Sequence, residues 1–327
     1  MKTIQDNFGR KFPYLRLSLT DQCNFRCQYC LPNGYQKTGD TSCFLSAEEV
    51  VRLVSAFAGL GIKKIRLTGG EPTLRKDLTI ISSHISRIKG IDTIAITTNG
   101  YNLSAKAKDF YDSGINALNV SVDSLDSKRF HEITGHDKLD VVLDGIEKAK
   151  KVGFGKIKIN TVLLKDVNDN ELPQILNWIK DQDLSVRFIE LMQTGDNLEY
   201  FGKHHLSAEI VKKKLTELGF TPSERKKDAG PAQEFEHPEY QGKIGIIAPY
   251  SKDFCKTCNR LRVTSKGDLR LCLFGDGGYS LRQFLKNDNQ REELQGKVLE
   301  LLHLKHETHY LDQGLTGITQ NLASLGG

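Results

Sequence analysis

The 327-residue sequence lacks any apolar run of about 18 residues, which excludes a membrane-spanning helix. Its first ten residues contain no apolar core of a secretory signal, so we expect a cytoplasmic protein. Repeats of fixed period and low-complexity tracts are also missing. Hydrophobic residues make up 38% and charged residues 27%, a globular composition whose length suggests about two domains.

The excess of positive charge is small. The 46 lysines and arginines exceed the 41 aspartates and glutamates by five. This balance suits an anionic substrate as well as it suits nucleic acid, and alone it does not decide between them.

Six short runs rich in β-branched and apolar residues predict β-strands, and helical patterns alternate with them. The runs cover residues 15–19, 64–67, 93–96, 117–122, 157–162 and 186–189. The helix after the first run begins with Ser46 and Glu49 at the spacing of a capping box. Six alternations of strand and helix predict an α/β fold with parallel strands and right-handed crossovers.

The alternation stops after Gly195. A closed eight-stranded barrel needs two more units, which the pattern does not supply. We therefore predict a partly open six-unit (βα) barrel over residues 1–195 and a smaller C-terminal domain over residues 196–327.

Six of the seven cysteines fall into two groups of three. Cys23, Cys27 and Cys30 directly follow the first predicted strand, at the end where catalytic loops gather in a barrel. Three thiolates with no adjacent fourth ligand can hold three irons of a cubane and leave the fourth iron open to a small molecule. The alternative is a zinc site, with Cys43 as the fourth ligand, although Cys43 better suits a small core position.

The CxxxCxxC spacing, with Tyr29 just before its last cysteine, resembles the radical S-adenosylmethionine (SAM) family. The resemblance implies a [4Fe-4S] cluster that binds the amine and carboxylate of SAM and cleaves it reductively to a 5′-deoxyadenosyl radical. The TGGEP segment at residues 68–72 resembles the SAM-amine motif of the family. Its glycines would let the backbone approach a ligand, and Glu71 could bind an ammonium group. The implied SAM contacts are Tyr29, Gly70, Ser121 and Met192.

The second group combines a CxxC pair with a third cysteine beyond a predicted hairpin turn at residues 265–268. Its members are Cys255, Cys258 and Cys272. By itself this group fits zinc about as well as an iron–sulfur cluster. The candidates for a fourth zinc ligand are His204, His205 and His237. A second incomplete trio in one chain favours a second open cubane. We expect the two cubanes to face each other across the barrel mouth, one binding SAM and the other the substrate.

Basic residues accompany these groups. Arg260 and Arg262 lie two apart, so on an extended segment they point to the same side, and paired guanidiniums beside a metal site suit a polyphosphate. Arg16, Arg66 and Lys158 lie within predicted strands. Any one of them could be a solvent-facing or ion-paired residue, but several on one barrel predict an interior cavity that binds an anion.

Over nearly its whole length the chain resembles the GTP-cyclising branch of the radical SAM family, which serves molybdenum cofactor biosynthesis. The likeness includes residues 66–72, 97–100, 187–190 and 258–262 and the final Gly-Gly. Gln193 departs from it, because proline is expected there, and Cys43 is extra. The implied GTP contacts are Arg16, Arg66, Thr97, Lys158, Arg260 and Arg262. Gly326 and Gly327 are implied as a side-chain-free tail in the active site.

The resemblance implies a lyase with two [4Fe-4S] clusters, SAM and an external one-electron donor. The radical would remove hydrogen from C3′ of the GTP ribose, and the C3′ radical would attack C8 of guanine. The implied product is (8S)-3′,8-cyclo-7,8-dihydroguanosine 5′-triphosphate. The resemblance also implies a homodimer that passes this product to cyclic pyranopterin monophosphate synthase and binds neither nucleic acid nor membrane.

Two alternatives stay open. Another twin-cluster radical SAM enzyme, such as a peptide or tetrapyrrole maturase, would give no reason for the paired arginines and the Gly-Gly tail. A zinc-containing nucleic-acid-binding protein would fit the CxxC pairs, but the sequence lacks the basic and aromatic clustering usual for that class.

Overall fold

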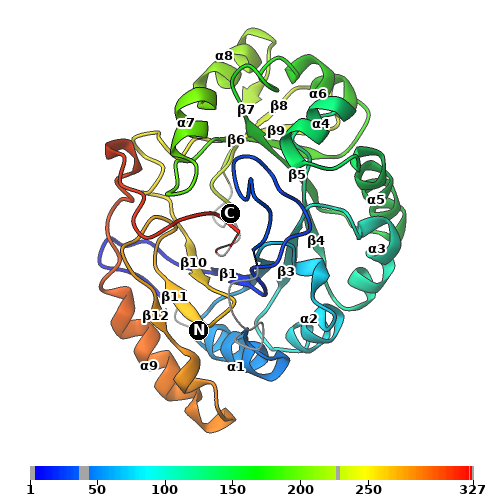
Figure 1. Ribbon diagram of the computed structural model, residues 1–327. Coiled ribbons are helices and arrows are strands. Elements are labelled where there is room, and N and C mark those ends of the chain that lie inside the picture. Colours follow the sequence, from blue (N-terminus) through cyan, green and yellow to red (C-terminus); the bar gives the residue numbers. More distant parts are fainter. Residues whose placement is uncertain (1–3, 37–43, 226–228, 324, 326–327) are drawn as a thin grey trace.

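A curved sheet of parallel strands forms the centre of the protein, and helices cover its outer side (Figure 1). The computed structural model describes residues 4–36, 44–225, 229–323 and 325. All six predicted strands are confirmed, each to within two residues at either end. They are β1 (Tyr14–Ser18), β2 (Lys64–Thr68), β3 (Thr93–Thr98), β4 (Ala117–Ser121), β5 (Ile157–Leu163) and β6 (Ser185–Glu190).

The crossover helices follow the predicted alternation. They are α1 (Ala47–Gly59), α2 (Leu78–Ser86), α3 (Leu103–Asp112), α4 (Ser127–Thr134), α5 (Leu139–Val152) and α6 (Leu172–Ile179). The capping box at the start of α1 is confirmed: the Ser46 hydroxyl accepts from the Glu49 amide, and the Glu49 carboxylate accepts from the Ser46 amide. Two of the first four amides of this helix are thereby satisfied, which fixes where it begins.

The chain after residue 195 adds helices and more strands to the same sheet. Its elements are α7 (Leu198–His204), α8 (Glu209–Glu217), β7 (Thr221–Pro222), β8 (Gln233–Glu236), β9 (Lys243–Ile247), β10 (Arg260–Val263), β11 (Asp268–Arg270), β12 (Tyr279–Ser280) and α9 (Arg291–Leu302). The predicted hairpin turn is present between the antiparallel strands β10 and β11. None of the helices in the described part of the chain has the length and apolar character needed to cross a membrane.

In the described part of the chain, the sheet contains eight parallel strands in the order β10-β1-β2-β3-β4-β5-β6-β9. Antiparallel β11 and β12 extend one edge, and β8 and β7 extend the other. The partly open six-unit barrel is confirmed, and β9 and β10 are two parallel strands that the sequence pattern did not indicate. The division into domains at residue 195 stays a prediction, because strands from both sides of that point share one sheet.

The two faces of the sheet differ in chemistry. Successive residues of a strand point to opposite faces. On β1, Leu15 and Leu17 are completely buried in the apolar core beneath the helices, whereas Arg16 between them faces the inside of the barrel. Parallel strands covered on both sides are usually apolar on both faces. The basic inner face therefore indicates a ligand site inside the barrel, which we call the lumen.

Candidate active site

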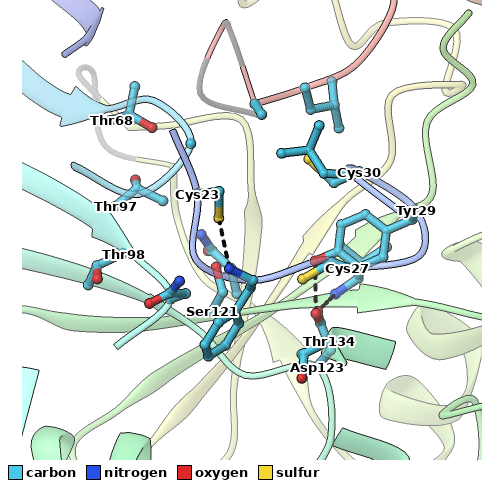
Figure 2. Close-up of a pocket in the computed structure, with 18 of the residues that line it drawn as sticks. Cys23, Cys27, Tyr29, Cys30, Thr68, Thr97, Thr98, Ser121, Asp123 and Thr134 are labelled. Atoms are coloured by element: carbon cyan, nitrogen blue, oxygen red, sulfur yellow. Dashed lines mark hydrogen bonds between the residues drawn. The ribbon is translucent and has the colours of Figure 1, made fainter. Parts of the chain in front are cut away.

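The first cysteine trio lies at the C-terminal end of the parallel strands (Figure 2). Cys23, Cys27 and Cys30 line one cavity with about 980 Å³ of empty space, part of it open to solvent. All four predicted SAM contacts and one predicted GTP contact line the same cavity. They are Tyr29, Gly70, Ser121, Met192 and Thr97. The structure thus brings together residues that are up to 169 positions apart in the sequence (23 to 192).

The cysteine loop is held in place by backbone and side-chain hydrogen bonds. The Arg26 amide donates to the Thr134 carbonyl at the end of α4 over 3.1 Å, and the Cys30 amide donates to the Cys27 carbonyl over 2.9 Å. The Tyr29 hydroxyl donates to a carboxylate oxygen of Asp123, just after β4, over 2.8 Å. Figure 2 shows this pair on one side of the loop. Asp123 was not predicted as a site residue.

Two glycines after β2 pack against this loop. A Cβ on Gly69, whose φ is +138°, would collide with the Thr20 carbonyl, and a Cβ on Gly70 would collide with the Gln22 carbonyl. The sequence-based explanation, that the glycines let the backbone approach a ligand, is therefore incomplete. Their absent side chains also allow the β2 loop and the cysteine loop to approach each other.

Glu71 has a different role from the one expected. Its buried carboxylate accepts hydrogen bonds from the Thr73 amide at 3.0 Å, the Thr98 hydroxyl at 2.8 Å and the Asn99 amide at 2.7 Å. It does not line the cavity. The idea that Glu71 binds the SAM ammonium group is wrong, because this carboxylate joins the β2 loop to the β3 loop.

The chemistry of the first trio fits an iron–sulfur cluster. Burial raises the pKa of Cys23 to about 11 and that of Cys30 to about 12, and it raises the pKa of Cys27 as well. These thiols need a bound cation to be thiolates at neutral pH, and soft thiolates are the ligands of iron–sulfur clusters. Among the described residues, no group of three or more His, Cys, Asp or Glu side chains is arranged to hold a single metal ion. Cys43 lies outside the described residues.

The second trio lies toward the opposite end of the barrel. Cys258 precedes β10, whose first residue Arg260 pairs with Tyr14 at the start of β1, whereas the first trio follows the end of β1. Cys272 follows β11, which runs antiparallel to β10, so it lies at the same end as Cys258. The five residues of β1 cover roughly 16 Å. The expectation that both trios face each other across the mouth is wrong: the lumen lies between them.

The three histidines considered as zinc ligands have other partners. One ring nitrogen of His204 is 3.0 Å from the Lys165 carbonyl, and one of His205 is 2.9 Å from Glu190. His237 contacts the rings of Phe220 and Tyr240. None of them is a partner of the second trio in the described residues, so this part of the zinc hypothesis is not supported.

The second trio has a cationic environment. Burial raises the pKa of Cys258, but the charges of Arg260 and Lys305 outweigh this effect and lower it to about 6. Lys305 is buried and donates to the Leu271 carbonyl beside Cys272. The Cys258 thiolate is thus stabilised by fixed positive charge, in contrast to the first trio, whereas burial raises the pKa of Cys255.

Between the trios, arginines from adjacent strands lie side by side. Arg16 of β1 pairs in register with Arg66 of β2 and Arg262 of β10. These three and Arg260 are only 7–8% exposed. Burial lowers the pKa of Arg66, and it lowers the pKa of Arg262 to about 10, so Arg262 is charged at neutral pH.

Three of these arginines, Arg66, Arg260 and Arg262, have no anionic partner among the described residues. In the described part of the chain, the Nε atoms of Arg66, Arg260 and Arg262 are buried and have no hydrogen-bond acceptor. Buried unpaired charges are costly, and clustered like charges add repulsion. A bound polyphosphate would supply the missing acceptors, because guanidiniums bind phosphate oxygens in pairs.

The other predicted GTP contacts continue this inner face toward the first trio. Thr97 of β3, Asn119 of β4 and Lys158 of β5 form one row across the strands. The Thr97 hydroxyl is buried and has no partner among the described residues. Gly326 and Gly327 lie outside the described residues, while Leu322 and Ala323 shortly before them line the cavity of the first trio.

Sequence reasoning missed several lumen residues. Lys64 shares the inner face of β2 with Arg66. Arg187 of β6 pairs in register with Asn160 of β5, which lines the cavity of the first trio. Tyr14 lies at the bottom of the lumen, with Lys64 Nζ 4.8 Å and Arg66 Cζ 5.5 Å from its ring centroid. Its buried hydroxyl has no partner in the described residues. Strand parity was a usable signal, because Lys64 and Tyr14 each lie two positions from a predicted contact on the same strand.

Comparisons with known proteins agree with this geometry. Residues 17–179 match the model of the Radical SAM superfamily, and residues 184–311 match that of Molybdenum Cofactor Synthesis C. The crystal structure of Streptococcus suis SuiB bound to S-adenosylmethionine has a TM-score of 0.63 and 16% identity, covering 96% of this chain and 77% of that chain. This likeness shows a shared fold. The chain is thus a radical SAM protein.

Curated relatives narrow the class further. The GTP 3′,8-cyclase of Psychromonas ingrahamii is 54% identical over 98% of this chain and 95% of its own length. That of Stenotrophomonas maltophilia is 54% identical over the whole of both chains. The protein belongs to the GTP 3′,8-cyclase family.

Proposed function

We propose that this protein is a radical SAM lyase that converts GTP to (8S)-3′,8-cyclo-7,8-dihydroguanosine 5′-triphosphate in molybdenum cofactor biosynthesis. The observation that carries the proposal is the buried row of arginines between two incomplete cysteine trios. A triphosphate supplies the acceptors that Arg66, Arg260 and Arg262 lack among the described residues, and a nucleotide held there lies between both trios.

Each group of residues has a distinct task in this proposal. Cys23, Cys27 and Cys30 hold one [4Fe-4S] cluster, and Cys255, Cys258 and Cys272 hold the other. SAM is held by Tyr29, Gly70, Ser121 and Met192. When bound, the first cluster and SAM supply the radical that removes hydrogen from C3′ of GTP.

The remaining residues position the substrate. Arg16, Arg66, Lys158, Arg260 and Arg262 bind the triphosphate, and Thr97 offers its hydroxyl from the side of the first trio. Fixing the charged end of GTP sets the position of the ribose, and such positioning is the main contribution of the protein to radical chemistry. Gly326 and Gly327 are proposed to complete the site as a side-chain-free tail.

The proposal includes the protein's partners and location. The enzyme receives electrons from an external one-electron donor, acts as a homodimer in the cytoplasm and passes its product to cyclic pyranopterin monophosphate synthase. It requires neither nucleic acid nor a membrane for activity.

Isotope transfer tests the reaction directly. The protein is purified and reconstituted without oxygen, then given SAM, dithionite and GTP deuterated at C3′. We expect about eight irons per chain. One deuterium should appear in each 5′-deoxyadenosine, with a product that is the C3′–C8 bonded isomer of GTP. ATP deuterated at C3′ is the control substrate. Zinc in place of iron, or 5′-deoxyadenosine without deuterium, would contradict the proposal.

A further inference from the structure

An ion pair crosses the inner face of the sheet at the β6–β9–β8 edge. Arg187 of β6 pairs in register with Gly245 of β9, and Gly245 pairs with Glu234 of β8. A Cβ at residue 245 would lie 2.9 Å from Cγ of Arg187. Because Gly245 has no side chain, Arg187 can extend across β9 and donate to Oε1 of Glu234 over 2.9 Å.

The same carboxylate oxygen lies 3.9 Å from Nζ of Lys158. Glu234 is therefore shared between two cations of the lumen, one of them a proposed GTP contact. Among the described residues no other ion pair involves Lys158, Arg187, Arg66, Arg260 or Arg262. The Glu234 side chain is 33% exposed, whereas that of Arg187 is 5% exposed, so the carboxylate belongs to the accessible side of the pair.

We propose that Glu234 is an internal counter-ion, which offsets part of the positive charge of Lys158 and Arg187 while the lumen is empty and is displaced from them by substrate phosphates. The inference rests on the proposed function for the identity of the anion. It makes Glu234 a specificity-determining residue, because a ligand must carry enough negative charge to replace a carboxylate at two cations. A triphosphate meets this requirement better than a monophosphate.

Loss of this carboxylate would have two effects of opposite sign. Without Glu234, Lys158 and Arg187 are left as neighbouring like charges, so the empty protein becomes less stable. The incoming triphosphate no longer competes with a resident anion, so it binds more tightly. If Glu234 had a merely structural role, its replacement would lower both the stability of the protein and its affinity for the triphosphate.

The test compares Glu234→Gln with Glu236→Gln in the reconstituted protein. Glu236 lies two residues along the same strand and pairs at 2.6 Å with Lys243 in an exposed position, so it is a matched control. The probes are GTP, GMP and inorganic tripolyphosphate, each measured by equilibrium binding and by its effect on thermal unfolding.

We expect Glu234→Gln to lower the Kd for GTP and for tripolyphosphate about tenfold and to change the Kd for GMP much less. Its melting temperature without nucleotide should fall, while the rise caused by GTP should become larger. In turnover, KM should fall by a larger factor than kcat changes. Glu236→Gln should match the wild type in every binding measurement. Glu234→Asp, which keeps the charge on a shorter side chain, should show a smaller gain in affinity.

A Kd for GTP within twofold of the wild-type value, or a higher one, would overturn the inference while leaving the proposed function intact. A wild-type protein that binds tripolyphosphate but not GTP would contradict the proposed function. If tripolyphosphate also bound Glu234→Gln more tightly, the counter-ion would still be supported. If Glu234→Gln does not fold, the Glu234→Asp variant takes its place in the test. An affinity of that variant for tripolyphosphate equal to the wild-type affinity would refute the counter-ion role of Glu234.

Discussion

Replacing Arg262 by methionine should weaken GTP binding while leaving the stability of the nucleotide-free protein almost unchanged. Arg262 lies in β10 with Arg16 and Arg270 as its register neighbours, and its buried Nε has no partner in the described residues. Charged hydrogen bonds are each worth about 1.5–3 kcal/mol, so losing one to the triphosphate should weaken GTP binding about 10- to 150-fold. Methionine keeps most of the buried chain length.

The same substitution should hardly affect the empty protein. It removes a buried charge next to the like charge of Arg260, and this relief offsets the lost packing and the lost attraction to Cys258 and Cys272. We expect the melting temperature without nucleotide to stay within about 2 °C of the wild-type value. Calorimetric titration with GTP and a thermal scan measure both quantities. Arg52→Met, which breaks an exposed pair with Asp288 at 2.8 Å, is the control and should bind GTP normally. Unchanged GTP affinity, or a drop in melting temperature above about 5 °C, would refute the reasoning.

Three further predictions concern other parts of the site. Burial and the charge of Arg187 lower the pKa of Lys158 to about 7. GTP affinity should therefore fall as the pH rises above 7 and Lys158 loses its charge. A Lys158→Arg variant that shows the same fall would contradict this explanation. Cys27→Ser should abolish SAM cleavage, whereas Cys258→Ser should still form 5′-deoxyadenosine without converting GTP, as chromatography of the products can check. Gly70→Ala should weaken SAM binding and iron incorporation, because its Cβ meets the Gln22 carbonyl. The control is Gly296→Ala, in open space on α9, which should stabilise the protein by about 0.5–1 kcal/mol. Equal effects of Gly70→Ala and Gly296→Ala would argue against a close contact between Gly70 and the cysteine loop.

Much of the fold could be predicted because the signals for its strands and helices lie within short stretches of the sequence. The six strands were bounded by turns and helical periodicity, and the Ser46–Glu49 box lies within four residues. The parallel strands β9 and β10 were missed for the opposite reason. β10 pairs with β1 across almost the whole chain, and only four residues form it, so neither periodicity nor length distinguished it from a hairpin arm.

The site was predicted less completely than the fold. The cysteine spacings and the arginines on strands were visible in the sequence. Their arrangement at opposite ends of the lumen depends on the direction in which β10 runs, which no local pattern encodes. Glu234 was missed because it contributes through a partner two strands away, and that contact exists only because Gly245 leaves room.

The pairing of β1 with β10 affects how the protein is made. Tyr14 and its neighbour Arg260 are 246 positions apart (260 − 14). At about 5–20 residues per second on the ribosome, roughly 12–50 s pass between the synthesis of the two partners. During this interval one edge of β1 is open, and such edges favour aggregation. A nascent chain of this protein therefore needs protection until translation is almost finished, and a chaperone acting early in synthesis should raise its soluble yield.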